Sequence, residues 1–249
     1  MTRILFPSGP ERTLAFYLSA EEYVAAMDLD DEAVFFWRVG PSVIFGRNQC
    51  MEAEVNVPWC REHGVRIYRR KSGGGCVYAD KGNIMISCVS PGVDVEFAFN
   101  RYLFRIAGVL ALLGINAEVS GRNDILSSGR KISGNACYIS RNKSIVHGTV
   151  LYDVNIDAML AAITPSSEKL SRHGVASVRQ RVANIRPLLG KDSAVYDPES
   201  LVSFISAHLC DGSQMLTEED AAKIETESAK YLDEVFIAGR DRKEMSLNR

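Results

Sequence analysis

Apolar side chains recur every three or four positions in several parts of the chain, and this spacing predicts amphipathic helices. Residues 99–113 show it most clearly, and Gly114 follows where such a helix would end. The same pattern predicts helices over residues 13–28, 155–163, 198–209 and 217–232. Thr217 and Asp220 stand at the spacing of a capping box, which supports a helix start at Thr217.

Short segments rich in β-branched and aromatic residues lie between these helices and predict strands. They are residues 33–39, 42–49, 65–70, 76–78 and 84–89, the last predicted to be buried on both faces. Two turn-like sequences, Ser128-Gly129 and Arg141-Asn142-Lys143-Ser144, divide residues 123–153 into a predicted three-stranded meander. Because no repeat, low-complexity tract or linker interrupts the pattern, we predict a single domain.

The most distinctive stretch lies between two predicted strands, where three basic residues at 69–71 run into Ser72 and then Gly73, Gly74 and Gly75. Glycines let a ligand approach the backbone closely, and clustered amides beside positive charge favour a bound anion. A phosphate or carboxylate would suit such a loop, but a tight basic hairpin explains the same residues equally well. The P-loop and dinucleotide motifs are excluded, because those glycines lead into a helix and these join two strands.

Polar side chains also gather in the predicted meander. Strand alternation places four of them on one face of its second strand: Lys131, Ser133, Asn135 and Cys137. In the third strand His147 and Thr149 share a face. These side chains could form a solvated sheet surface or line a polar pocket, and the pattern alone leaves both interpretations open.

Composition and charge narrow the class of protein. A chain of 249 residues with 46% hydrophobic and 24% charged residues is typical of a globular protein with its own core. A net charge of −2 argues against a nucleic-acid or membrane-surface protein, although residues 61–71 are locally basic. No apolar run approaches the roughly 20 residues of a membrane span, and Pro7 and Gly9 interrupt any signal peptide. We therefore expect a cytoplasmic protein.

The six cysteines and four histidines do not indicate a metal centre. No CxxC pair occurs, and the cysteines do not cluster with the histidines in the sequence. A disulfide framework is typical of small secreted domains rather than of a chain with this much predicted core.

Several motifs stand in a defined order along most of residues 13–190. They are residues 43–49, residues 69–78 with Asp80, Gly82 and Asn83, residues 121–125, residues 129–136, His147-Gly148-Thr149 and residues 177–184. Together they resemble the catalytic domain of lipoate–protein ligase A and its relatives in the biotin/lipoate ligase superfamily. A biotin ligase fits less well, because the GRGRRGR-type stretch of those enzymes has no counterpart here.

The resemblance implies an α/β (α+β) fold of the class II synthetase and biotin/lipoate ligase type, with a mixed, largely antiparallel sheet flanked by helices. Residues 1–249 would form one catalytic domain with a core at about 13–235, and the C-terminal accessory domain of many such ligases would be absent. The implied reaction joins lipoate to ATP, giving lipoyl-AMP and pyrophosphate. The lipoyl group then passes to a lysine of a lipoyl carrier domain.

The resemblance also assigns roles to residues of the two polar stretches. Lys131 would be catalytic, bridging the activated carboxyl group and the α-phosphate, and Arg70 would meet the phosphate or carboxylate. Asp124 would contact the nucleotide or hold Mg²⁺. The other binding residues that the resemblance implies are Ser72, Gly73, Gly74, Gly75, Cys76, Val77, Tyr78, Asn83, Asn123, Gly134, His147 and Thr149.

By the same resemblance, the cofactors are ATP and Mg²⁺ and the substrate is lipoate. The partner is a lipoyl carrier domain, either of a 2-oxoacid dehydrogenase E2 subunit or the glycine cleavage H protein, with a separate accessory protein as a further candidate. No nucleic-acid or membrane partner is expected. The sequence departs from the family pattern at Ala79 and Val146, where histidines are common.

Two alternatives remain at this stage. A lipoyl or octanoyl transferase would take a preformed acyl donor and would need a reactive thiolate, for which Cys137 is the first candidate and Cys76 the second. A non-catalytic binder of lipoate or of an adenylate is the other alternative, which the loss of Arg70 or Lys131 would support, and neither residue is lost.

Overall fold

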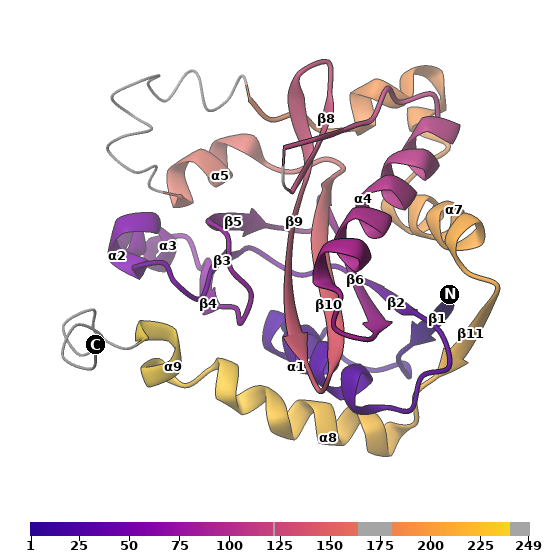
Figure 1. Cartoon of the computed structure of the whole chain (residues 1–249). Helices are drawn as coiled ribbons and strands as arrows, with labels where there is room; N and C mark the ends of the chain where they lie inside the picture. The colour runs from indigo at the N-terminus through magenta and orange to yellow at the C-terminus, as the bar shows by residue number, and fades with distance from the viewer. Residues whose placement is uncertain (122, 164–180, 240–249) are drawn as a thin grey trace.

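A large mixed sheet forms the centre of the protein (Figure 1). The computed structural model describes residues 1–121, 123–163 and 181–239. Within these residues the sheet has eight strands, in the order β11 (Gly212–Met215), β1 (Thr2–Leu5), β2 (Ala33–Trp37), β6 (Asn83–Pro91), β10 (Lys143–Leu151), β9 (Arg130–Ser140), β8 (Asp124–Ser127) and β7 (Glu118–Ser120). Strand β1 pairs in parallel with β2 and β11, and the other neighbours pair antiparallel. This confirms the mixed, largely antiparallel sheet.

A second, smaller sheet carries the glycine-rich loop. Its order is β4 (Arg66–Arg69), β3 (Ser42–Phe45), β5 (Cys76–Ala79), with β3 parallel to β4 and antiparallel to β5. Because β3 lies between β4 and β5, the loop of residues 70–75 crosses over the end of β3 and does not close a hairpin. The hairpin interpretation of this loop is therefore wrong.

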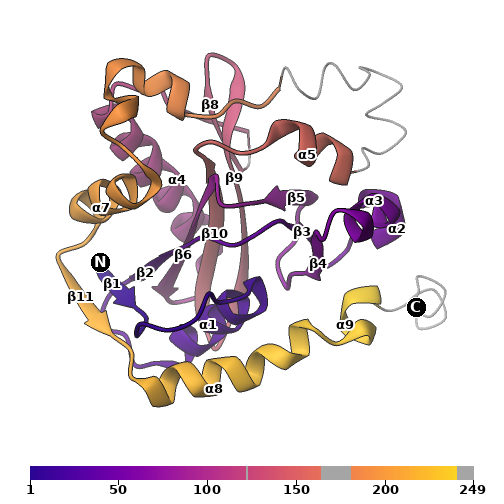
Figure 2. The same ribbon diagram turned by 180° about the vertical axis from the view of Figure 1, so that it is seen from behind.

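Helices surround both sheets (Figures 1 and 2). Within the described residues they are α1 (Leu14–Ala26), α2 (Met51–Glu54), α3 (Val57–Glu62), α4 (Val95–Leu112), α5 (Ile156–Ala162), α7 (Pro198–Leu209), α8 (Glu218–Ser228), α9 (Glu234–Ala238) and the 3-10 helices η1 (Arg186–Ala194) and η2 (Ala229–Tyr231). None of the helices described is long and apolar enough to cross a membrane.

The two faces of the large sheet bury different sets of side chains. Ile84 and Ile86 of β6 face the core under α4 and α7. Met85 and Val89 of the same strand face the core under α1, which α8 backs. Strand β6 is thus buried on both sides, as its continuous apolar sequence predicts. A third core, containing Tyr78, joins the small sheet to α3 and α5.

The element boundaries follow local chemistry. Helix α7 spans the predicted residues because Asp197 caps its first turn, and the predicted capping box of Thr217 and Asp220 is present. Helix α4 begins four residues before the predicted start, because the Asp94 side chain accepts a hydrogen bond from the Phe97 amide. The meander is formed by β8, β9 and β10, with positive φ angles at Ser128 and Gly129 in its first turn.

Candidate functional site

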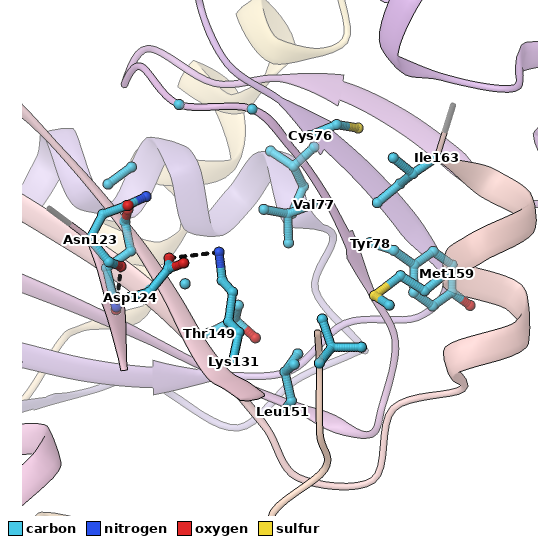
Figure 3. Close-up of a pocket in the computed structure, with 18 of the residues that line it drawn as sticks. Cys76, Val77, Tyr78, Asn123, Asp124, Lys131, Thr149, Leu151, Met159 and Ile163 are labelled. Atoms are coloured by element: carbon cyan, nitrogen blue, oxygen red, sulfur yellow. Dashed lines mark hydrogen bonds and ion pairs between the residues drawn. The ribbon is translucent and has the colours of Figure 1, made fainter. Parts of the chain in front are cut away.

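A pocket of about 600 Å³ lies between the small sheet and the meander (Figure 3). Most of the predicted binding residues line it: Arg70, Gly74, Gly75, Cys76, Val77, Tyr78, Asn123, Asp124, Lys131, Gly134, His147 and Thr149. Ser72, Gly73 and Asn83 do not line it, although Ser72 contacts His147 and Asn83 contacts Thr149 from behind. The structure therefore brings the two polar stretches of the sequence into one cavity. Residues 177–180 of the last motif and residue 122 lie outside the described residues.

Lys131 occupies the middle of this pocket. Its ammonium Nζ lies 2.8 Å from Asp124 Oδ1, and both side chains are about one-third exposed. A Cβ on Gly134 would stand 2.6 Å from Lys131 Cε and 2.7 Å from Nζ, so Gly134 makes room for the lysine. The Lys131 amide donates to the Arg181 carbonyl at 2.7 Å, and its own carbonyl accepts from Ala183 at 2.9 Å. These two bonds hold the backbone of Lys131 at the edge of β9.

A β-bulge turns Lys131 toward the pocket. Gly134 pairs with Asp124, but Lys131 pairs with Leu126, so β9 carries one extra residue opposite β8. The extra residue shifts the alternation, and Lys131 shares the face of Gly134 rather than that of Asn135. The prediction that Lys131, Asn135 and Cys137 share one face is therefore wrong for Lys131, because simple alternation ignores the bulge.

The two candidate nucleophilic cysteines do not fit that role, one by its position and the other by its pKa. Cys137 pairs with Val146 and packs against the core under α4, on the face opposite Lys131. Burial raises the pKa of the Cys137 thiol. Cys76 does line the pocket, but burial raises its pKa to about 12, which keeps it a thiol at neutral pH. Neither provides the reactive thiolate that the transferase alternative requires.

The buried side chain of Arg70 makes hydrogen bonds to the backbone of the glycine-rich loop. Its guanidinium donates to the carbonyls of Ile44, Gly73 and Gly75 and to Ser72 Oγ, at 2.7–3.2 Å. Burial lowers the pKa of Arg70 to about 10. With these four acceptors the guanidinium holds the loop in its curved form. The direct contact with a substrate anion that the resemblance implies stays a prediction.

The loop also needs Gly46, at the end of β3. A Cβ at this position would lie 2.1 Å from the Gly74 carbonyl oxygen, so no other residue allows the loop to pack so close to β3. Gly74 itself has a φ of +86°, a conformation that favours glycine. Of the three consecutive glycines, Gly74 is thus explained by its backbone conformation.

Amide side chains support the wall of the pocket that the meander forms. Asn135 Nδ2 donates to the Asn123 carbonyl at 3.0 Å, and Asn123 Nδ2 donates to the Asn135 carbonyl at 3.3 Å. Gly148 on β10 leaves room for Asn135, because a Cβ there would lie 1.7 Å from Asn135 Oδ1. Asn83 Nδ2 donates to Thr149 Oγ1 at 2.7 Å, so the buried Asn83 orients a pocket residue from behind.

His147 is connected to a buried carboxylate that the sequence analysis did not identify. Its Nε2 lies 2.7 Å from Ser72 Oγ, and its Nδ1 lies 2.8 Å from Glu21 Oε1. Glu21 is fully buried on α1. A signal was present in the sequence, because Glu21 stands at a position of the helix that continues the apolar stripe of Leu14 and Leu18.

Two apolar walls, which belong to different cores of the protein, also line the pocket of Lys131. One joins the core under α1 and consists of Leu18, Trp37, Ile44 and Met85. The other joins the core under α5, where Figure 3 shows Tyr78, Leu151, Met159 and Ile163. A cavity with a central ammonium and two apolar walls suits a ligand with negative charge in its middle and less polar groups at both ends.

Comparison with known proteins gives a consistent result. The family profile of the lipoyl protein ligase A/B catalytic domain matches residues 14–203. Lipoate-protein ligase LplJ of Bacillus subtilis is 38% identical over 174 residues, which cover 69% of this chain and 53% of the relative. Lipoate–protein ligase 1 of Staphylococcus aureus is 34% identical over 230 residues, covering 91% and 70%. The chain thus spans about half the length of the Bacillus relative it matches.

Solved structures share the fold. A bi-partite lipoate protein ligase from Thermoplasma acidophilum, described together with its E2 lipoyl domain, has 25% sequence identity and a TM-score of 0.78, with 96% of this chain and 97% of that chain covered. A lipoate-protein ligase A bound with ATP has 24% identity and a TM-score of 0.77, covering 96% and 98%. These similarities confirm the fold expected from the sequence.

Proposed function

The chain belongs to the family of lipoyl protein ligase A/B catalytic domains, and on this basis we propose that it joins lipoate to ATP and transfers the lipoyl group to a carrier lysine. The observation that carries the proposal is the position of the Lys131 ammonium in one pocket with two apolar walls and the glycine-rich loop. The relatives from Bacillus and Staphylococcus are both named lipoate–protein ligases, which supports the same activity.

In the first step the lipoate carboxylate attacks the α-phosphorus of ATP, and pyrophosphate leaves. Both reacting groups are anions, so the step needs positive charge where they meet. Lys131 supplies that charge, and it would exchange its ion pair with Asp124 for the carboxyl and α-phosphate oxygens. The backbone of residues 75–78 would cradle the nucleotide, and no nucleophile from the protein is required.

The apolar wall of Leu18, Trp37, Ile44 and Met85 would receive the acyl tail of lipoate. The opposite wall, with Tyr78 and Met159, would cover the adenine side of the nucleotide. Enclosure between the two walls also keeps water from the acyl-adenylate, which would otherwise hydrolyse.

Mg²⁺ fits this site only together with ATP. Within the described residues, no three His, Cys, Asp or Glu side chains are grouped for a metal ion. Mg²⁺ usually takes one or two protein carboxylates and completes its shell with phosphate oxygens and water. Asp124 is the carboxylate that lines the pocket near Lys131 and can serve as that ligand. When bound with ATP, the ion would neutralise charge on the phosphates.

In the second step the amine of a carrier lysine attacks the carbonyl carbon of lipoyl-AMP, and AMP leaves. The E2 lipoyl domain described with the Thermoplasma ligase supports a carrier of that type. The glycine cleavage H protein is the second carrier to test. Because the Thermoplasma ligase is described as bi-partite, a second protein that completes the transfer also has to be tested.

Mass spectrometry of a carrier domain tests the proposal. The carrier is incubated with the protein and lipoate, with and without ATP, and a lipoyl mass increase that requires ATP is expected. The Cys137→Ala variant should give the same increase. Transfer from a preformed acyl donor without ATP would instead show a transferase, and binding without either reaction would show a non-catalytic binder. Lipoyl-AMP formation without transfer would show that a second protein is needed.

A further inference from the structure

A buried hydrogen-bond chain connects α1 with the glycine-rich loop. It runs from Glu21 through His147 and Ser72 to Arg70, with distances of 2.8, 2.7 and 2.9 Å between successive polar atoms. Glu21 and Ser72 are fully buried, and His147 is 8% exposed. This hydrogen-bond chain therefore lies behind the pocket wall. Of its four residues, only His147 and Arg70 line the pocket.

The partners of Glu21 define which way the hydrogen bonds run. Ser87 Oγ donates to Oε1 at 2.7 Å, and the Tyr138 hydroxyl donates to Oε2 at 3.1 Å. Both carboxyl oxygens therefore already act as acceptors, which is the hydrogen-bond pattern of a carboxylate without a proton to give. His147 Nδ1, 2.8 Å from Oε1 and 3.0 Å from Oε2, must then carry the hydrogen.

On the other side of the imidazole ring, Ser72 determines whether Nε2 of His147 carries a hydrogen. Its Oγ accepts from Arg70 Nε at 2.9 Å, and its own hydroxyl hydrogen then needs an acceptor. His147 Nε2, at 2.7 Å, is the neighbouring atom that can accept it. A doubly protonated imidazole would offer Ser72 two donors and leave its hydroxyl hydrogen without a partner.

We infer that Glu21 is a positioning residue that holds His147 as the neutral Nδ1–H tautomer and so orients Ser72 and the loop around Arg70. Glu21 also reaches the acyl wall, because Trp37 Nε1 donates at 3.0 Å to Ser87 Oγ, which in turn donates to Glu21. One buried carboxylate thus orients pocket residues from both sides. The effect on substrate binding rests on the proposed function, whereas the tautomer does not.

Ser72, His147 and Glu21 follow the order of a nucleophilic triad, but this hydrogen-bond chain does not fit that role. Ser72 Oγ does not line the pocket, and Arg70 donates to it. The charged and titratable groups that face His147 are Glu21 from α1, Tyr138 from β9 and, through Ser72, Arg70 from the loop. Arg70 stands at the other end of the hydrogen-bond chain, beyond the neutral His147 and Ser72, and its positive charge balances the negative charge of Glu21.

The tautomer can be read directly by ¹⁵N NMR of the imidazole in the wild-type protein at neutral pH, without substrate. The spectrum of His147, assigned with a His147→Gln variant, should show a protonated Nδ1 and an unprotonated Nε2. An Nε2–H tautomer or an imidazolium would overturn the inference. This measurement stands even if the protein shows no lipoate-dependent reaction, so failure of the proposed function and failure of the tautomer are distinguishable.

Glu21→Gln then tests the positioning role. The carboxamide can present a donor to Nδ1, so His147 should change tautomer, and the KM for lipoate in ATP–pyrophosphate exchange should rise about tenfold. The kcat should change less than about threefold, because the ammonium of Lys131 stays in place. Glu22→Gln is the matched control, since Glu22 pairs with Lys71 and Lys230 away from the pocket. An unchanged tautomer and KM in Glu21→Gln would overturn the role, and if that variant does not fold, the wild-type spectrum decides.

Discussion

The side chain of Lys131 lies directly over Gly134, where a methyl group would come within 2.6 Å of its Cε and 2.7 Å of its Nζ. Gly134→Ala should therefore displace the ammonium while leaving the strand intact, because alanine is compatible with a strand and only the end of a flexible side chain has to move. We expect kcat for adenylate formation to fall about 100-fold, as a displacement of about 1 Å can cost that much.

Adenylate formation and the thermal midpoint of unfolding should be measured in parallel for this variant. Gly108→Ala is the control, because a Cβ at Gly108 in α4 meets nothing within 4 Å and alanine favours the helix. A fully active Gly134→Ala protein would show that the present position of Lys131 is not the one used in the reaction.

Lys131→Ala should abolish lipoyl-AMP formation and leave the fold unchanged. The Lys131 side chain is one-third exposed, so its loss leaves no large cavity, whereas a charge at the reaction centre is worth about 3–4 kcal/mol of barrier. Lipoyl-AMP is quantified by chromatography, and unfolding is followed by circular dichroism. Lys223→Ala, at an exposed ion pair of α8, should match the wild type. A near-normal yield of lipoyl-AMP from Lys131→Ala would contradict the catalytic assignment.

The position of Lys131 also shows what the sequence could and could not predict. The resemblance identified the residue, but strand alternation put it on the wrong face, because the bulge between β8 and β9 depends on pairing that no local pattern reveals. The same limit applies to the glycine-rich loop. Its crossing over β3 follows from the parallel pairing of β3 with β4, which brings together segments on either side of two helices.

Elements with strong local signals were predicted well. Helix α7 begins after Asp197 and the meander turns at Ser128 and Arg141, and in each case the deciding residues are neighbours in the sequence. Glu21 was missed for the opposite reason. The apolar stripe of its helix indicates burial, but its partners Ser87, Tyr138 and His147 are far away in the chain, so what the carboxylate contacts becomes visible only in three dimensions.

Arg70→Ala should weaken both the fold and substrate binding. The substitution leaves the carbonyls of Ile44, Gly73 and Gly75 without their donor, and we expect the free energy of unfolding to fall by on the order of 3 kcal/mol. Arg70→Lys should not restore it, because an ammonium cannot reproduce the planar set of donors. Chemical denaturation and calorimetric titration with a non-hydrolysable lipoyl-adenylate measure the two effects. Wild-type affinity in Arg70→Ala would show that the loop is not an anion site.

The cysteines should differ in reactivity at pH 8. Burial raises the pKa of Cys76 to about 12, so below that pH it stays a neutral thiol, and only at strongly alkaline pH would a thiolate form. Cys50 is exposed. We expect iodoacetamide to modify Cys50 rapidly and Cys76 slowly, as measured by peptide mass spectrometry, with ligase activity unaffected by the modification of Cys50. Rapid modification of Cys76 would contradict its burial in the pocket wall.

Arg69 connects the C-terminal part of the described chain to the loops beside the pocket. Its Nε and Nη2 donate to the carbonyls of Ile237 and Ala238 at 2.8 Å, while its Nη1 donates to those of Arg47 and Gln49 at 2.8 and 2.9 Å. The guanidinium is 4.4 Å from the centre of the Phe45 ring, over its face. Helix α9 is therefore held by a residue that immediately precedes Arg70.

Removing this guanidinium in Arg69→Ala should release α9, because a five-residue helix is not stable without tertiary contacts. Hydrogen–deuterium exchange of residues 234–238 should then become much faster, and exchange in residues 46–49 should also rise, since two of their carbonyls lose a donor. Arg66→Ala on the exposed side of the same strand is the control. Unchanged exchange in residues 234–238 would show that the contacts of η2, such as Tyr231 against Phe236, rather than Arg69, hold α9 in place.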